Sequence, residues 1–217
     1  MDIYKLSNSI EGDKKTFQIT DLKQGVKNPN RVNVFVDGKY VFSLDVAQVV
    51  DLKLKVGWEV SDDELAELKK ASEYGKLYQR ALEKALTRPH SEREICDYLN
   101  KKVYEKKLDK KYISDIVEKL KDKKYVDDRR FAEFWVENRF VKKGVSRKRL
   151  SLELMKKGIS REIVEEVLDK RNDEEEILKI IEKKRAKYDD EKLISYLVRQ
   201  GFSYQLAQSQ VRDFGTD

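Results

Sequence analysis

Three stretches of the sequence can be superimposed without gaps: SEREICDYLNKKV (residues 91–103), SRKRLSLELMKKG (146–158) and DDEKLISYLVRQG (189–201). Each begins with a residue type that caps helix N-termini and continues with apolar residues four positions apart. Internal similarity of this kind indicates a repeat protein. The matching apolar residues are Ile95, Leu150 and Leu193, followed by Leu99, Leu154 and Leu197.

Further helical patterns flank each stretch. Apolar periodicity predicts a helix before each one, over 77–87, 128–141 and 174–187, and another after it, over 111–122, 160–169 and 203–212. We therefore predict a mainly α fold with three tandem three-helix repeats, over 74–126, 127–171 and 172–217. One such unit buries its own apolar faces poorly, so we expect neighbouring repeats to form a curved, elongated stack.

The N-terminal part of the chain, residues 1–73, has a different pattern. VNVFVDGKYVFSL (32–44) places β-branched and aromatic residues on both sides of Asp37-Gly38, which predicts a β-hairpin with a two-residue turn. We expect further strands around 17–22 and 58–60, a short helix over 46–52, and a linking helix that begins at Ser61 with a capping partner at Glu64. The sequence thus predicts a small N-terminal β-rich domain.

Composition narrows the class of protein. Of the 217 residues, 41% are charged and 39% are apolar, which favours small modules over one large core. No apolar run has the length of a membrane span and no secretory signal is visible, so we expect a cytoplasmic protein with no membrane association. The single cysteine, Cys96, excludes an internal disulfide and a thiolate metal cluster. We also expect a monomer.

The net charge of +6 is concentrated in the middle of the chain. Residues 71–171 hold 28 basic and 19 acidic side chains, whereas 1–70 hold 11 and 12, and 172–217 hold 8 and 10. Between residues 139 and 161, nine cations face one acid, Glu153. Because unpaired like charges oppose folding unless an anionic partner accepts them, this segment favours an anionic partner surface. The cations are Arg139, Lys142, Lys143, Arg147, Lys148, Arg149, Lys156, Lys157 and Arg161.

A second segment, YVDDRRFAEFWVENR (125–139), raises the alternative of a catalytic acid pair. Asp127 and Asp128 stand where the second repeat begins, so we interpret them as helix-start residues rather than an acid/base pair. Phe131, Phe134 and Trp135 follow at helical spacing, and we expect them to form a core against the first repeat.

Catalytic templates are not found. The sequence has no glycine-rich phosphate-binding loop, and its only histidine, His90, cannot form an HExxH motif or a histidine pair for zinc. We expect His90 in a surface loop and Cys96 as a small packed residue. No enzymatic activity, cofactor or metal is predicted.

The order of four motifs resembles the RecX family of regulatory proteins. The motifs are TRPHSEREICDYL, YVDDRRFAEFWVENR, KKGVSRKRLSLELMKKGIS and KLISYLVRQGFSY, and the similarity extends to the hairpin RVNVFVDGKYVFSL. Two departures from the family pattern are mild: His90 replaces a basic residue and Gln200 stands where an arginine or lysine is common.

This resemblance implies a non-enzymatic modulator of the RecA recombinase. RecX proteins bind in the groove of the RecA filament on single-stranded DNA, usually slowing its ATP hydrolysis and strand exchange and limiting filament growth. We therefore expect the RecA filament and the single-stranded DNA phosphate backbone as partners. The residues expected to make these contacts are Arg139, Lys142, Lys143, Arg147, Lys148, Arg149, Lys156 and Lys157.

Other classes of function stay open. A three-helix unit with a basic second or third helix is also typical of a stand-alone helix-turn-helix regulator of duplex DNA. A scaffold with incidental charge is a weaker alternative, and a nuclease or ATPase is weaker still.

Overall fold

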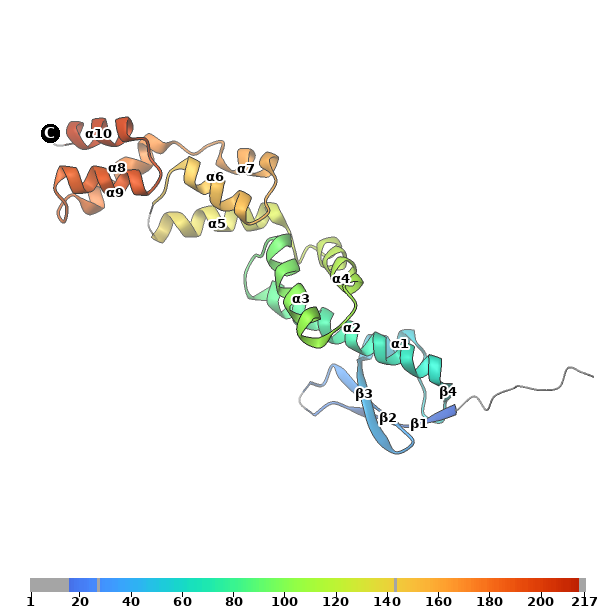
Figure 1. Ribbon diagram of the computed structural model, residues 1–217. Helices are drawn as coiled ribbons and strands as arrows, with labels where there is room; N and C mark the ends of the chain where they lie inside the picture. The colour runs from blue at the N-terminus through green and yellow to red at the C-terminus, as the bar shows by residue number, and fades with distance from the viewer. Residues whose placement is uncertain (1–15, 27, 143, 215–217) are drawn as a thin grey trace, which may run out of the picture. The chain divides into compact units, whose positions relative to one another are not determined.

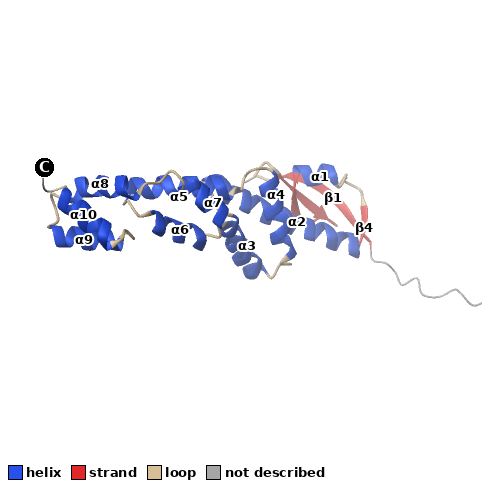
Figure 2. Ribbon diagram, turned by 90° about the horizontal axis from the view of Figure 1, so that it is seen from above, coloured by secondary structure: helices blue, strands red, loops and turns tan. Residues whose placement is uncertain are grey.

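The computed structural model describes residues 16–26, 28–142 and 144–214, and only the backbone of residues 139–142. It confirms the predicted fold class: the described part is mainly helical and has one small antiparallel sheet near its N-terminal end. Figure 2 shows the strands confined to that end and helices in the rest of the chain. The chain divides into two compact units, Met1–Arg80 and Ala81–Asp217.

The sheet of the N-terminal unit has the strand order β3-β2-β1-β4 with antiparallel neighbours throughout. Its strands are β1 (Thr16–Gln24), β2 (Arg31–Val36), β3 (Lys39–Asp45) and β4 (Glu59–Ser61). The predicted hairpin is confirmed, since Asp37 and Gly38 both have positive φ, 49° and 78°, as a type I′ turn requires. The predicted strand around Trp58 is short and begins only at Glu59.

Two helices, α1 (Val46–Asp51) and α2 (Asp62–Thr87), accompany this sheet (Figure 1). Leu65 and Leu68 of α2 share a buried core with strand residues such as Ile19, Val34 and Leu44. The Ser72 hydroxyl donates a hydrogen bond to the Ser43 carbonyl oxygen at 2.7 Å, which ties α2 to β3. The start of α2 therefore contributes to the core of the sheet.

The linking helix begins as the sequence predicts. The Ser61 amide donates to the Glu64 carboxylate at 2.8 Å, and the Glu64 amide donates back to the Ser61 hydroxyl at 3.3 Å. This is the reciprocal capping arrangement expected from the sequence. Helix α2 then runs 26 residues without interruption, through the predicted boundary at residue 73. The predicted repeat boundaries therefore stay a proposal.

The second unit contains the end of α2 and eight further helices in the described residues. Helices α5–α7 share one buried core, and α8–α10 share another. The positions aligned in the sequence are all fully buried: Ile95, Leu99, Leu150, Leu154, Leu193 and Leu197 are each 0% exposed. The helices are α3 (Glu92–Lys106), α4 (Lys111–Asp122), α5 (Asp128–Lys142), α6 (Arg147–Lys156), α7 (Arg161–Leu168), α8 (Asp173–Lys184), α9 (Asp190–Arg199) and α10 (Tyr204–Asp213).

The second helix of each repeat starts with the cap that the sequence predicts. The side chains of Ser91, Ser146 and Asp189 each accept a hydrogen bond from the amide three residues later, at 3.2, 3.2 and 2.9 Å. Each bond satisfies one of the free amides at a helix start. The three helices α3, α6 and α9 are therefore equivalent elements of a repeat, as the sequence alignment indicates.

Candidate nucleic-acid interface

The basic segment extends from the end of α5 to the end of α6. Arg139 and Lys142 lie in the last turns of α5, and only their backbone is described. Lys143 lies outside the described residues. The five remaining cations of the predicted contact set belong to α6 and its C-cap: Arg147, Lys148, Arg149, Lys156 and Lys157.

The first turn of α6 carries an unusual charge for a helix start. It holds Arg147, Lys148 and Arg149 and no acid, whereas the equivalent helices α3 and α9 each begin with two acids. Free amides make a helix N-terminus electropositive, so three cations there repel it and one another. Arg147 and Lys148 are exposed, and their side chains form no ion pair with any described residue. This turn therefore presents Arg147 and Lys148 to solvent, while the Asp173 carboxylate, which accepts a hydrogen bond from the Arg147 amide at 2.7 Å, offsets part of the positive charge.

Two cations of the predicted contact set have structural partners instead. Arg149 forms an ion pair with Glu153 at 3.4 Å, and its guanidinium also donates to the Arg199 carbonyl oxygen. Lys157 forms an ion pair with Glu94 at 2.7 Å and lies over the Trp135 ring, 5.1 Å from its centroid. Arg147, Lys148 and Lys156 are thus the cations that the described structure leaves available to a partner.

Lys157 belongs to a joint between the first two repeats. The Ser91 hydroxyl donates to the Lys157 carbonyl oxygen at 2.8 Å, and the Glu92 amide donates to the Asp128 carboxylate at 2.7 Å. The N-terminus of α3 therefore meets the C-terminal end of α6 and the first residue of α5. Gly158 closes the joint: its φ is +85°, and a Cβ there would lie 2.8 Å from the Cβ of Arg93.

The same joint occurs between the second and third repeats. The Ser146 amide donates to the Gln200 carbonyl oxygen at 3.1 Å, and the Arg147 amide donates to the Asp173 carboxylate at 2.7 Å. Gly201 has a φ of +96°, and a Cβ there would lie 2.9 Å from the Cβ of Arg149. Glycine thus recurs at the end of two aligned stretches for the same reason: at both positions the backbone closely approaches the preceding repeat.

The acid pair at 127–128 has the helix-start role that the sequence predicts. Asp127 accepts a hydrogen bond from the Arg130 amide at 3.0 Å and so caps its own helix, α5. Asp128 instead caps the helix of the preceding repeat, at the Glu92 amide. Burial raises the pKa of Asp128, against the lowering effect of that hydrogen bond. The two carboxylates therefore serve two different helices.

The aromatic residues after this pair correct one prediction. Phe131 is fully buried, and Trp135 packs against the same core, within α5–α7 rather than against the first repeat. Phe134 is half-buried and belongs to no such core. The indole nitrogen of Trp135 donates to Glu153 at 3.1 Å.

The prediction of a surface position for His90 is wrong, since its side chain is 2% exposed. Its Nδ1 lies 2.7 Å from the Arg88 carbonyl oxygen, so the proton of the neutral ring is on Nδ1. Burial lowers the pKa of His90. Burial also raises the pKa of the Cys96 thiol, which is half-buried in α3. Both residues therefore pack as neutral groups.

A half-buried acid, Glu94, accompanies His90 at the first joint. Burial alone would raise its pKa, but hydrogen bonds and charges from Arg88 and Lys157 outweigh burial, and the pKa is lowered. Within the described ranges, no three His, Cys, Asp or Glu side chains gather so that they could hold a metal ion. Nor does any helix of the described part combine the length and apolar composition needed to cross a bilayer.

Comparison with known proteins follows this division of the chain. A family model described as "Regulatory protein RecX N-terminal domain" matches residues 17–61, and one described as "RecX, second three-helix domain" matches residues 127–168. The regulatory protein RecX of Listeria monocytogenes serotype 4a is 30% identical over 206 residues, covering 88% of this chain and 74% of the relative. The chain belongs to the RecX family.

Other RecX proteins match over 65% to 91% of this chain. The regulatory protein RecX of Oceanobacillus iheyensis is 32% identical over 146 residues, which is 65% of this chain and about half (51%) of that relative. The crystal structure of RecX from Lactobacillus salivarius matches with a TM-score of 0.56 and 26% identity, over 68% of this chain and 99% of that one. A crystal structure of a regulatory protein RecX has a TM-score of 0.67 over 91% of this chain and 99% of that one; at 21% identity this shows a shared fold.

Sequence reasoning missed the joints of this RecX protein. It identified Asp128 as a helix-start residue but not as the cap of another helix, and it did not single out Asp173 at all. One signal was the glycine at the same place in two of the three aligned stretches, since a recurring glycine often marks positive φ or a close approach of the backbone.

Proposed function

We propose that this RecX family protein binds the RecA filament on single-stranded DNA and slows its ATP hydrolysis, strand exchange and growth. Family membership and the names of the relatives support a regulatory role. The observation that carries the proposal is the first turn of α6, where three cations oppose the helix dipole and two of them lack a partner among the described residues. An anionic surface that accepts these charges accounts for an arrangement that otherwise costs stability.

The single-stranded DNA backbone is the proposed anion. Arg147 and Lys148 at one end of α6 and Lys156 at the other are exposed. A helix of this length spans about 15 Å, so one strand can pass both ends. Arg139, Lys142 and Lys143 stay candidates for the same contact, because they precede α6 directly in the chain. Arg149 and Lys157 are proposed to contribute charge while holding the joints.

RecA ATPase activity on single-stranded DNA, titrated with this protein, tests the proposal. We expect the wild type to lower ATP turnover and the double variant Arg147→Gln/Lys148→Gln to need a much higher concentration for the same effect. Each lost phosphate contact should flatten the slope of log affinity against log salt by about 0.7. Arg149 is left unchanged because its loss would break an inter-repeat contact.

A matched control is available in α3. Lys101 and Lys106 are exposed and form no ion pair with described residues, so Lys101→Gln/Lys106→Gln removes equal charge elsewhere. We expect this variant to inhibit like the wild type. Equal loss of inhibition in both variants would refute the placement of the site on α6, and no inhibition by the wild type would refute the function.

A stand-alone regulator of duplex DNA is the second candidate, supported by the basic second helix of the middle repeat. Footprinting on duplex DNA without RecA separates the two. Protection of one specific sequence would favour this second function.

A further inference from the structure

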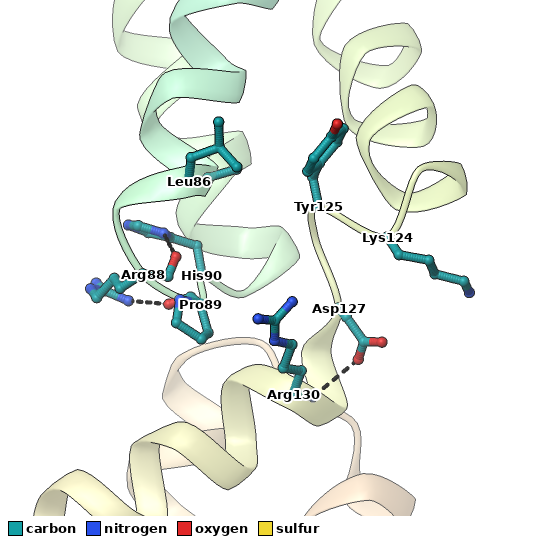
Figure 3. Close-up of a pocket in the computed structure, with 9 residues that line it drawn as sticks. Leu86, Arg88, Pro89, His90, Lys124, Tyr125, Asp127 and Arg130 are labelled. Atoms are coloured by element: carbon teal, nitrogen blue, oxygen red, sulfur yellow. Dashed lines mark hydrogen bonds between the residues drawn. The ribbon is translucent and has the colours of Figure 1, made fainter.

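A hollow of about 180 Å³ lies beside the first joint, between the end of α2 and the start of α5. Its walls differ in character. One wall is apolar, made by Ala85, Leu86 and Pro89, and the other carries Tyr125 and Arg130. In Figure 3 the Arg130 guanidinium extends from α5 into the space between these walls, whereas Lys124 and Asp127 point away from it.

Among the residues that line the hollow, Arg88, His90 Nδ1 and Asp127 have hydrogen-bond partners in the fold, whereas Arg130 and Tyr125 are open to solvent. The Arg130 side chain is exposed and forms no ion pair with any described residue, although its neighbour Arg129 pairs with both Glu133 and Glu166. Tyr125 is 40% exposed and Leu86 is 64% exposed. An aromatic face, an apolar face and an unpaired guanidinium therefore converge on one small open space.

The hollow is also adjacent to the end of α6. Lys157, the C-cap of α6, contacts Glu94 at 2.7 Å, and Glu94 contacts Arg88 of the hollow at 2.9 Å. The exposed Lys156 thus directly precedes Lys157, which is linked through Glu94 to Arg88 in the lining of the hollow. Two consecutive ion pairs thus link the C-terminal end of α6 to a residue that lines the hollow.

We propose that this hollow binds one unstacked base of a single DNA strand, with the base against Tyr125 and Leu86 and an adjoining phosphate at Arg130. Base–aromatic stacking is tolerant of sequence, because every base has a π-face, and a guanidinium matches the geometry of phosphate. The proposal rests on the proposed function only in taking a single strand as the source of the base.

Photocrosslinking of the full chain tests the position of the base. An oligothymidylate carrying 5-iododeoxyuridine is irradiated with the protein in the absence of RecA, and the crosslinked peptide is identified by mass spectrometry. We expect a crosslink at Tyr125. Crosslinks only at other aromatic residues, such as the exposed Tyr104, would overturn the proposal.

Affinity and its salt dependence distinguish the two contacts. Tyr125→Leu keeps the apolar bulk but removes the π-face, so affinity for oligothymidylate should fall about fivefold or more with the salt slope unchanged. Arg130→Gln should flatten the salt slope by about 0.7. The controls Tyr104→Leu and Lys101→Gln change the same residue classes on α3 and should bind like the wild type. Wild-type affinity in both Tyr125→Leu and Arg130→Gln would overturn the proposal.

A free nucleotide has the same base and phosphate groups as a DNA strand, so a separate experiment must test whether the hollow binds nucleotides instead. Thymidine monophosphate is added in excess before irradiation. A crosslink that persists assigns the hollow to the strand, and complete protection by the monophosphate with no loss of strand affinity would overturn that assignment. The crosslinking experiment contains no RecA, so its result can be interpreted even if the wild-type protein does not inhibit RecA. If the wild type inhibits RecA but gives no crosslink at Tyr125, only the proposal for the hollow is refuted.

Discussion

Single residues at the joints have measurable effects because they combine backbone and packing constraints. Gly57 and Gly158 have the same φ of +85°, but a Cβ at Gly57 meets nothing within 4 Å, whereas at Gly158 it would lie 2.8 Å from Arg93. Gly57→Ala should therefore cost only the left-handed conformation, about 1–2 kcal/mol.

Gly158→Ala should cost more than Gly57→Ala by roughly another 1 kcal/mol or more, because the added methyl group also displaces Arg93. Urea denaturation of both variants measures the difference. An equal decrease in the free energy of unfolding for both variants would show that Arg93 moves aside without measurable cost.

His90 should make stability depend on pH. Burial lowers the pKa of His90 in the folded protein below its ordinary value of about 6.5. In the pH window between these two pKa values, His90 is protonated in the unfolded chain but neutral in the folded protein. Stability contributed by neutral His90 is therefore lost as the pH falls through this window, at up to about 1.4 kcal/mol per pH unit. His90→Phe should remove this part of the slope. Denaturation measured on both sides of the window tests it, and an unchanged slope would contradict the assignment.

At the scale of elements, α6 should trade stability for binding. Its first turn places cations where acids are preferred, so neutralising Arg147 and Lys148 together should raise the free energy of unfolding by about 0.3–1 kcal/mol per charge at low salt. Thermal denaturation at low and high salt checks this, since salt should remove the gain. A loss of stability in this variant would mean that these cations have a structural role.

Most elements could be predicted from the sequence because local signals define them. Capping serines, the Asp37-Gly38 turn and apolar periodicity act within a few residues, and the predicted range 111–122 coincides with α4. The burial of His90 and the partners of Arg149 and Lys157 could not be predicted in this way. The partners of Arg149 and Lys157 depend on which helix ends meet across 50 or more residues, as in the contacts of Arg149 with Arg199 and of Lys157 with Glu94.

At the scale of the whole molecule, the two joints should couple neighbouring repeats independently. Asp128 and Asp173 accept the equivalent amide at different joints, so replacing either with alanine leaves a helix-start amide without its acceptor. The loss should be about 1–3 kcal/mol at the part-buried Asp128 bond and smaller at the exposed Asp173 bond. We expect the double variant to show additive losses, because separate sites without shared partners add.

Hydrogen exchange locates these losses. Asp173→Ala should lower amide protection in α6 and α8–α10 while the strands of the N-terminal unit keep theirs. Asp173→Asn is the matched control, since its amide oxygen can still accept the hydrogen bond from the Arg147 amide. Loss of protection in the sheet would contradict separate joints.

In both joints a capping serine donates to a carbonyl group at the C-terminal end of the equivalent helix one repeat later, through its hydroxyl at Ser91 and through its amide at Ser146. We therefore expect the number of repeats to be open to change by gene duplication. A second copy of 127–171 inserted after the first would bring Ser146 of the first copy to the Lys157 carbonyl group of the second, and Gly158 again at the close approach. The mismatch would be one of charge, since Lys157 would face Arg149 where it now meets Glu94. A longer protein of this design thus requires one compensating charge substitution at the new boundary and no new hydrophobic core.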